Sequence, residues 1–555
     1  MADGYRFAVA QNLARPDVRP GRLANKLGNV GYLDDGTNPM RYKSSALRSD
    51  LIGGRLCRTA LTAAMLLLAA CSSLQPVDLP PEYTPVPARA PIWETLEADK
   101  PGDWYVLLNR GPEALDWRLR SIDSATESID FQTFLWSSDT AGALVLDHLF
   151  SAAERGVQVR LLVDDTFLLG KDRILLEIAH HPKIEYRVFN PYKRRASGFA
   201  TRQALNLAEF HRLDHRMHNK AMVIDNRVTI VGGRNIADEY FGLHEEANFR
   251  DLELLVGGPI VAEVSATFDS YWNDRWSVPI EALTHVESAP ADLEAARLVS
   301  NQSMHLHVEE SDDVRLESWE NIIATAVDGR ARLYADKPPQ DNPAEETEAP
   351  VQVESALIEM FDAATDEILI VSAYLIPTPE LEGAVERAIQ RGVRIRMLTN
   401  SIRSNNHLSA HSAYRNHIKT LMTSGTELHE VRIDAHDRHI YMLSPIEEKT
   451  LSLHAKALVI DDDKVFIGSA NLDPRSLRMN TEMGLLVESE ALNAIVRDAV
   501  SPDFDRPNAW ELQLDENGDV LWVSDDVVLA TQPAMSIMQR IEDWFFSHLP
   551  IEGEL

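Results

Sequence analysis

The sequence predicts an α/β fold made of two tandem, similarly built domains. The chain has 555 residues, which is too long for one ordinary domain. A strand–helix–strand pattern occurs twice, and the glycines that end its two helices, Gly156 and Gly392, lie 236 positions apart. A dense polar pattern recurs at the same offset. The repeat therefore indicates two copies of one α/β unit.

The repeated elements can be placed along the chain from their hydrophobic periods. Each copy has a strand, a helix and a second strand, at 129–135, 141–154 and 157–163 in the first copy and at 368–375, 381–390 and 393–398 in the second. Each helix stops at an Arg-Gly pair and is followed by a β-branched run. That order is typical of a βαβ unit.

Seven segments are expected along the chain. They are a leader at 1–39, a signal peptide at 40–70, a Pro-rich tether at 71–100, a first domain at 101–280, a linker at 281–325, a second domain at 326–510 and a C-terminal hairpin with an amphipathic helix at 511–555. The tether is expected to lack helix and strand, because proline fixes φ and favours extended backbone. For the C-terminal helix, docking of its apolar face on the domain core is favoured, and a membrane-interface role is the alternative.

The N-terminal segment has the features of an export signal. Residues 60–70 form an apolar run that is too short to cross a bilayer and has the length of a signal-peptide core. Basic residues precede it and Cys71 follows it, which resembles a bacterial lipobox. We therefore expect translation to start at Met40 and Cys71 to carry lipid, anchoring the protein to a membrane and facing the periplasm. Ser72 after the cysteine favours the outer membrane over the inner one.

The charge balance narrows the classes of partner. Lysine and arginine number 54 against 86 acidic residues, a net charge of −32. Such a chain repels nucleic acid, so a nucleic-acid-coating role is disfavoured. Two cysteines cannot build a disulfide framework. The sequence identifies no accessory protein.

The polar pattern that repeats is rich in groups able to bind and transfer phosphate. Each copy has a histidine, a lysine two residues later, then an aspartate and an asparagine, and every pair is 236 residues apart: His218 and His454, Lys220 and Lys456, Asp225 and Asp461, Asn235 and Asn471. On a strand, histidine and lysine two apart point to the same face. Ammonium and amide donors on one patch suit an oxyanion, above all phosphate.

Paired histidines suit phosphoryl transfer, because one imidazole can attack phosphorus while the other protonates the leaving alcohol. Asp251 and Glu482 lie downstream in strand-like runs, where a carboxylate could hold each imidazole in the right tautomer. No metal site is expected, because carboxylates are few and lysine is a poor ligand. No nucleotide cofactor is expected either, since the chain has neither GxxxxGK nor GxGxxG.

The paired motifs resemble the two HKD motifs of the phospholipase D superfamily. The stretches RMHNKAMVIDNRVTIVGGRNIADEYFG and GSANLDPRSLRMNTEMG, with the HSAY run at 411–414, are similar to those of bacterial cardiolipin synthases of the C type. The resemblance implies two tandem phospholipase D-like α-β-α sandwich domains related by a pseudo-twofold axis and sharing one active site. Asp251 lies five residues further along its half than Glu482 does, so its role departs most from the repeat.

The resemblance also implies roles. His218 would attack the phosphodiester of a phosphatidyl donor and His454 would act as acid and base. Lys220, Lys456, Asn235 and Asn471 would bind the phosphoryl oxygens. Asp225 and Asp461 are placed with the histidines and lysines among the catalytic residues, where they would shape the site rather than touch substrate. The substrates would be phosphatidylglycerol with a second phospholipid, phosphatidylethanolamine included, and no cofactor would be needed.

Two further points come from the sequence. Seven basic residues between positions 193 and 220 lead into the first motif, and we expect them to form a rim that faces lipid headgroups. The motifs leave open a phospholipase D that transfers the phosphatidyl group to water, and a phosphodiesterase or nuclease on the same scaffold. A non-catalytic lipoprotein is disfavoured, because both histidine–lysine pairs are intact.

Overall fold

The computed structural model describes residues 74–196, 198–284, 291–303, 310–339, 352–525 and 527–548. All described residues belong to one compact unit. The leader, the signal peptide and Cys71 lie outside the described residues, so the expectations about them stay predictions.

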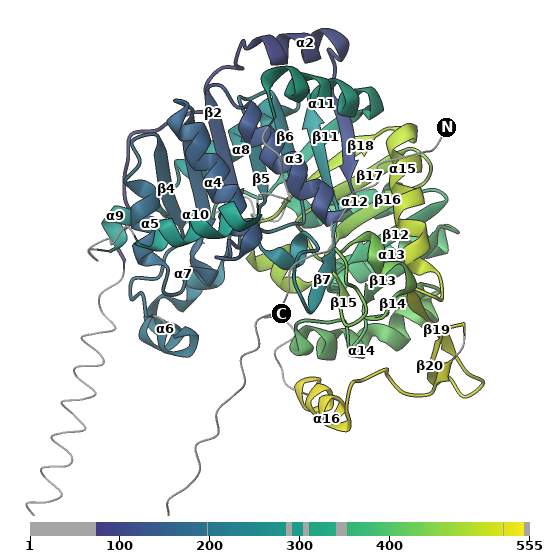
Figure 1. Ribbon diagram of the computed structural model, residues 1–555. Coiled ribbons are helices and arrows are strands. Elements are labelled where there is room, and N and C mark those ends of the chain that lie inside the picture. Colours follow the sequence, from purple (N-terminus) through teal and green to yellow (C-terminus); the bar gives the residue numbers. More distant parts are fainter. Residues whose placement is uncertain are drawn as a thin grey trace, which may run out of the picture. The chain divides into compact units, whose positions relative to one another are not determined.

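The first half is built on a nine-stranded mixed sheet (Figure 1). Its parallel centre, β2–β3–β4, continues on one side into the antiparallel strands β5, β6, β8 and β1. In spatial order the strands are β10 (Val327–Asp328), β1 (Trp104–Leu108), β8 (Glu253–Gly257), β6 (Val228–Gly232), β5 (Ala221–Ile224), β2 (Ser128–Thr133), β3 (Gln158–Asp164), β4 (Ile184–Phe189) and β9 (Ser277–Pro279).

The second half repeats this order in a ten-stranded sheet. Its parallel centre is β12–β13–β14, again followed on one side by antiparallel strands. In spatial order the strands are β11 (Arg330–Ala335), β18 (Met483–Glu488), β17 (Lys464–Gly468), β16 (Lys456–Ile460), β12 (Glu367–Ser372), β13 (Arg394–Asn400), β14 (Glu427–Val431), β19 (Ala509–Leu514), β20 (Val520–Val523) and β21 (Val528–Leu529). The matching orders confirm the α/β repeat expected from the sequence.

Helices cover both faces of the sheets. The longer ones are α2 (Pro91–Asp99), α3 (Gly111–Ser124), α4 (Thr140–Glu154), α5 (Asp172–Ala179), α8 (Val261–Trp272), α10 (Ala291–Ser303), α11 (Asp312–Thr325), α12 (Gln352–Ala363), α13 (Pro379–Gln390), α14 (Leu408–Ser424), α15 (Glu490–Val500) and α16 (Ile537–Phe546); α6 (Phe199–Leu205), α7 (Phe210–Asp214) and α9 (Ile280–Leu283) are shorter. Helix α4 covers β3 on the outer face of the first half, whereas α8 and α15 lie between the halves. The layers are those of two α-β-α sandwiches.

Each half has a hydrophobic core of its own, and a further hydrophobic cluster joins the two halves. That buried cluster contains Val223 and Leu254 of the first sheet together with Val459 and Leu485 of the second. A two-stranded parallel sheet also joins them, formed by β7 (Ala247–Arg250) and β15 (Thr450–Leu453). Strand β15 leads directly into His454, and an isolated bridge between Met217 and Thr481 joins the halves beside His218.

The segment expected to be an unstructured tether is a folded part of the first half. Residues 91–99 form α2, with a proline in its first turn, and Trp93 and Leu96 are buried. Upstream, the backbone N–H and side-chain hydroxyl of Thr84 donate to Asp269. The expectation of no helix in 71–100 is therefore wrong, because apolar side chains in this segment complete the first core.

The C-terminal hairpin is confirmed, as β19 and β20 pair around Asn517-Gly518 and extend the second sheet. The expected C-terminal helix is α16, but its apolar face does not pack on the core: Ile537, Met538, Ile541, Trp544 and Phe545 are exposed. The favoured docking of that face is thus wrong for the part of the helix that the structure describes. No helix among the described residues is both long and apolar enough to cross a membrane.

Candidate active site

The two histidines lie at equivalent places in the two sheets. His218 and Lys220 come just before β5, and His454 stands two residues before the start of β16. Strands β5 and β16 run antiparallel to β2 and β12, so both motifs sit at the edge where the parallel strands of each sheet end. All residues of β5 and β16 are buried, and apart from Lys456 they are apolar. Burial of these strands within the sheets fixes the positions of the polar residues at their ends.

Each histidine is held by a carboxylate from the other half. The Nδ1 atom of His218 lies 2.9 Å from both carboxylate oxygens of Glu482, and Nδ1 of His454 lies 2.6 Å from Oδ2 of Asp251. Backbone hydrogen bonds cross between the halves in the same way: the N–H of His218 donates to the carbonyl of Thr481, and the N–H of His454 donates to the carbonyl of Arg250. The Nδ1 contacts leave Nε2 of each ring as the atom available to a substrate. The two motifs therefore form one site.

The lysines return to the backbone of their own histidines. Lys220 Nζ donates to the carbonyl of His218 at 2.6 Å, and Lys456 Nζ donates to the carbonyl of His454. Both lysines are buried. Lys456 Nζ also lies 2.9 Å from Nδ1 of His454, and Lys220 and His218 both contact the ring of Phe134. Each lysine therefore lies beside its own histidine, although the histidines precede the strands.

The asparagines are buried in the loops after β6 and β17. Asn235 donates from its amide nitrogen to the hydroxyl of Tyr240 at 2.9 Å, and Asn471 is 4% exposed. Their phosphate-binding role stays a prediction.

Aromatic rings that the sequence reasoning missed pack on both imidazoles. Tyr240 meets His454 edge-on with centroids 4.9 Å apart, and Phe134 meets His218 at 4.8 Å. Tyr240 could have been found from its place inside the first motif run, whereas Phe134 lies 84 residues before His218. The rings fix the imidazole planes in addition to the carboxylates.

Burial and neighbouring cations keep both imidazoles neutral. Burial and the charges of Lys220 and Lys456 lower the pKa of His218 well below its ordinary value, and burial and Lys456 lower the pKa of His454 to about 3. Burial also lowers the pKa of Lys220 to about 7 and that of Lys456 to about 8. A bound phosphodiester anion would raise all four, because it favours the charged forms.

The two carboxylates differ in their surroundings. Burial would raise the pKa of Asp251, but His454 and the cations Lys456 and Arg234 lower it below the ordinary value. Burial raises the pKa of Glu482 to about 8. The residues behind them differ too: Gly233 leaves room for Asp251, whose Oδ1 lies 2.3 Å from where a Cβ would be, whereas Ser469, at the same place in the second half, donates its hydroxyl to Glu482. Asp251 is the stronger anion of the two.

Asp225 and Asp461 are not brought to the histidines. They follow the far ends of β5 and β16, and each accepts bonds from the backbone that begins the next parallel strand. Asp225 accepts from Glu127, Ser128 and the indole of Trp93, and Asp461 accepts from the N–H groups of 365–367. Their placement among the catalytic residues is therefore wrong, since they fasten the strand ends opposite the site.

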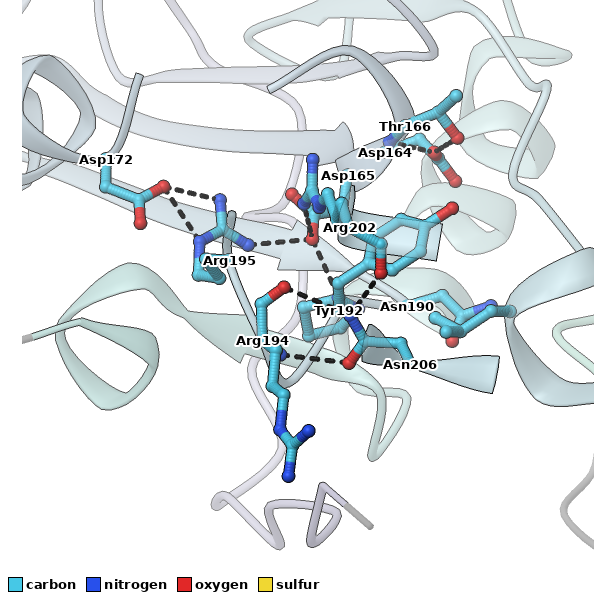
Figure 2. Close-up of polar contacts among 12 residues, drawn as sticks. Asp164, Asp165, Thr166, Asp172, Asn190, Tyr192, Arg194, Arg195, Arg202 and Asn206 are labelled. Atoms are coloured by element: carbon cyan, nitrogen blue, oxygen red, sulfur yellow. Dashed lines mark hydrogen bonds and ion pairs between the residues drawn. The ribbon is translucent and has the colours of Figure 1, made fainter. Parts of the chain in front are cut away.

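Several arginines of the expected basic rim point into the protein. Figure 2 shows Arg195 and Arg202 converging on the carboxylate of Asp165, with Arg195 also reaching Asp172. Arg216 pairs with Asp164, whose carboxylate also accepts from the N–H of Met217, next to His218. Three of the seven basic residues thus neutralise buried acids and brace the segment before His218, and the expectation of a headgroup-facing rim is wrong for these three arginines.

Within the described ranges of the chain, no three His, Cys, Asp or Glu side chains lie close enough together to hold a metal ion. The cations of the site are side chains, Lys220 and Lys456.

Known proteins are similar to this chain in sequence and in fold. The family model described as "Cardiolipin synthase, PLD-like domain" matches residues 119–272 and 357–503, one segment in each half. The chain is 34% identical over 463 residues to cardiolipin synthase C of Escherichia coli K12, which covers 80% of this chain and 94% of that protein. It is 24% identical over 401 residues to cardiolipin synthase B of the same organism, covering 72% and 79%.

Among solved structures, phosphatidylserine synthase of Haemophilus influenzae Rd KW20 superposes with a TM-score of 0.49 at 15% identity, covering 76% of this chain and 92% of that one. The family model matches both motif-bearing segments, and the alignment with the 34% identical relative covers 94% of that relative's length. The chain therefore belongs to the phospholipase D superfamily, in the cardiolipin synthase family of PLD-like enzymes, and is an enzyme of the superfamily's transferase type.

Proposed function

We propose that the enzyme is a phosphatidyltransferase that makes cardiolipin from phosphatidylglycerol and a second phospholipid, either phosphatidylglycerol or phosphatidylethanolamine. The observation that carries the proposal is the crossed pairing of His218 with Glu482 and His454 with Asp251, which puts two oriented imidazoles and two lysines in one buried site. The relatives named cardiolipin synthase support the substrate class.

In the first step, Nε2 of His218 attacks the phosphorus of the donor and forms a phosphatidyl-histidine. The bond from phosphorus to the headgroup oxygen breaks, and His454, which the bound phosphodiester anion and Asp251 favour in its imidazolium form, gives that oxygen a proton. In the second step His454 takes a proton from the acceptor alcohol, whose oxygen attacks phosphorus and releases His218. Phosphodiester bonds are broken and formed in equal number, so no nucleotide is consumed.

The unequal carboxylates support this division of roles. The strongly ionised Asp251 stabilises a protonated His454, as an acid requires. Glu482, whose pKa burial raises to about 8, stabilises an imidazolium less, which leaves His218 neutral and nucleophilic. The ammonium groups of Lys220 and Lys456 bind the anionic phosphoryl oxygens, which the chain's net charge of −32 would otherwise repel.

For location, we propose a lipoprotein anchored through Cys71 and facing the periplasm, with the outer membrane favoured. The basic stretch, the apolar run 60–70 and Cys71 support this assignment. Mass spectrometry of the protein from native membranes should show an N-terminal Cys71 that carries lipid. An unmodified Cys71 would refute the anchor without bearing on the activity.

The activity is tested by incubating the purified protein with phosphatidylglycerol micelles, with and without phosphatidylethanolamine, and identifying the products by mass spectrometry. Cardiolipin should form, and should be lost in His218→Ala and in His454→Ala. His436→Ala is the matched control, because this histidine lies on the surface. Phosphatidic acid as the sole product would identify a hydrolase and overturn the synthase proposal.

The nucleophile is tested with a phosphatidyl ester of p-nitrophenol, whose leaving group needs no proton. His454→Ala should still release p-nitrophenol in a burst equal to the enzyme concentration, because His218 is present, and His218→Ala should not. The opposite pattern would exchange the roles of the two histidines.

A further inference from the structure

Helix α16 is attached to the protein by its polar side. Asp543 is 1% exposed and accepts from the Ser412 hydroxyl at 3.0 Å and from Arg415 at 3.1 Å, while its Oδ1 lies 2.9 Å from Nδ1 of His411. Gln539 donates to the carbonyl of Ile402 at 2.9 Å. These bonds to α14 and to the end of β13 fix which side of the helix faces outward.

The side of α16 that faces outward is apolar. Ile537, Met538, Ile541, Trp544 and Phe545 are between 52% and 75% exposed, and we call them the α16 patch. Soluble proteins rarely expose a contiguous face of this kind unless it binds something. A helix with aromatic and aliphatic side chains on one face suits the interface of a bilayer.

A second exposed apolar group lies in the first half. Leu205 ends α6, Leu207 lies in the short helical turn Leu207–Glu209, and Phe210 begins α7; their exposed fractions are 44%, 69% and 51%. We call these three residues the α6 patch. The segment follows β4, just as the loop that holds α16 follows β13.

Both patches lie at the edge that holds the catalytic histidines. The parallel strands β4 and β13 end at this edge, where β5 and β16 begin. Asn400, the last residue of β13, bonds the backbone of Leu453, next to His454. Figure 1 shows α6, α7 and α16 at its lower end, with α2 and α11 at the upper end.

The N-terminal end of the described chain also lies at this edge. The first described residue, Leu74, donates its backbone N–H to Glu209 at 2.7 Å, between Leu207 and Phe210. Cys71 is three residues earlier, so it lies within about 11 Å of Leu74 along an extended chain. An acyl chain on Cys71 would therefore enter a membrane beside the α6 patch.

We propose that the α16 patch and the α6 patch insert into a lipid bilayer and hold the catalytic edge against its surface. The choice of lipid as occupant rests on the proposed function, and it is supported by the position of Leu74 at one patch. The net charge of −32 disfavours electrostatic adsorption to anionic lipid, so inserted apolar side chains supply the affinity. Binding is thus expected to depend little on salt.

The test places single environment-sensitive NBD labels on the full-length chain with Cys57→Ser and Cys71→Ser, so that no acyl anchor contributes. The labelled variants are Ile541→Cys, Leu207→Cys and, as the matched control, Val314→Cys on α11, whose exposed fraction is 46%. With phosphatidylcholine–phosphatidylglycerol vesicles, emission at 541 and 207 should shift to the blue and fall at least about twofold with doxyl-labelled lipid. Emission at 314 should not change.

Two results would overturn the proposal. One is equal quenching at all three positions, or at none. The other is a label at 541 that is already buried without vesicles in a protein whose mass is that of a dimer, which would assign the patch to a second copy of the chain.

Failure of docking and failure of the proposed function can be told apart. Ile541→Ser with Trp544→Ser should lose activity on vesicles at least about tenfold but keep it on short-chain phosphatidylglycerol below its critical micelle concentration, because the chemistry does not need the patch. Activity on monomeric lipid with unchanged vesicle activity would refute the docking alone. No transfer on either substrate by the unmodified protein would refute the proposed function.

Discussion

At the scale of single residues, each imidazole depends on a carboxylate that lies more than 200 positions away in the sequence. Asp251→Asn should lower kcat about 100- to 10,000-fold, because the amide no longer holds Nδ1–H of His454 or stabilises the imidazolium. Steady-state rates of cardiolipin formation measure this. Substrate binding should change little, so a loss confined to KM would contradict the orienting role of Asp251.

Asp225 provides the matched control, since it belongs to the same repeated pattern but sits at the other end of β5. Asp225→Asn should leave kcat and KM of the folded enzyme unchanged. It should lower the free energy of unfolding by about 1–3 kcal/mol, because one carboxylate oxygen that accepts several bonds becomes a donor. Urea unfolding and the same rate assay separate the two effects, and a selective loss of kcat would restore Asp225 to the catalytic group.

The buried lysines predict an alkaline limb in the pH profile. The pKa values of about 7 for Lys220 and about 8 for Lys456 mean that the ammonium is present below these values and lost above them. Values of kcat/KM, which report the free enzyme, should therefore fall as pH rises through 7–8. In Lys220→Arg the limb should move to higher pH, because guanidinium stays charged. A profile that is flat to pH 9 in the unmodified enzyme would contradict the requirement for the ammonium forms of Lys220 and Lys456.

At the scale of elements, the segment before the first sheet stabilises the fold. Trp93 packs edge-on against Trp319 and donates to Asp225. Trp93→Ala should lower the free energy of unfolding by about 3–5 kcal/mol, the cost of a large buried cavity. Tyr83→Ala, at an exposed position of the same segment, should change it by less than about 0.5 kcal/mol in the same urea titration. Equal effects would mean that the segment is a tether after all.

Sequence patterns identified these elements better than their partners. Hydrophobic period found α16 and its apolar face, but which face docks depends on His411, more than 100 residues earlier, meeting Asp543. The basic run likewise looks solvated on its own, yet Arg216 and Arg202 are neutralised by Asp164 and Asp165 from the end of β3. Such pairings form only when the chain folds, so local composition does not contain them.

At the scale of the whole molecule, the internal repeat was the strongest guide. The constant offset between the two motifs predicted two similar sheets and, for histidine, lysine and asparagine, equivalent places in each. It could not predict that Asp251 and Glu482 would each pair with the histidine of the other half, because a repeat describes what lies inside each copy and not how the copies pack. The departure of Asp251 from the repeat matches its different surroundings, Gly233 in place of Ser469.

The shared hydrophobic cluster and the crossed pairs together predict that neither half is stable or active alone. Seven of the 10 tryptophans lie before residue 320, so intrinsic fluorescence reports chiefly on the first half. A label at the exposed Ile495 on α15 would report on the second. Because one buried cluster draws strands from both sheets, both probes and the loss of transferase activity should follow one urea transition. Two separated transitions, or activity that outlasts the unfolding of either half, would show that the halves fold independently.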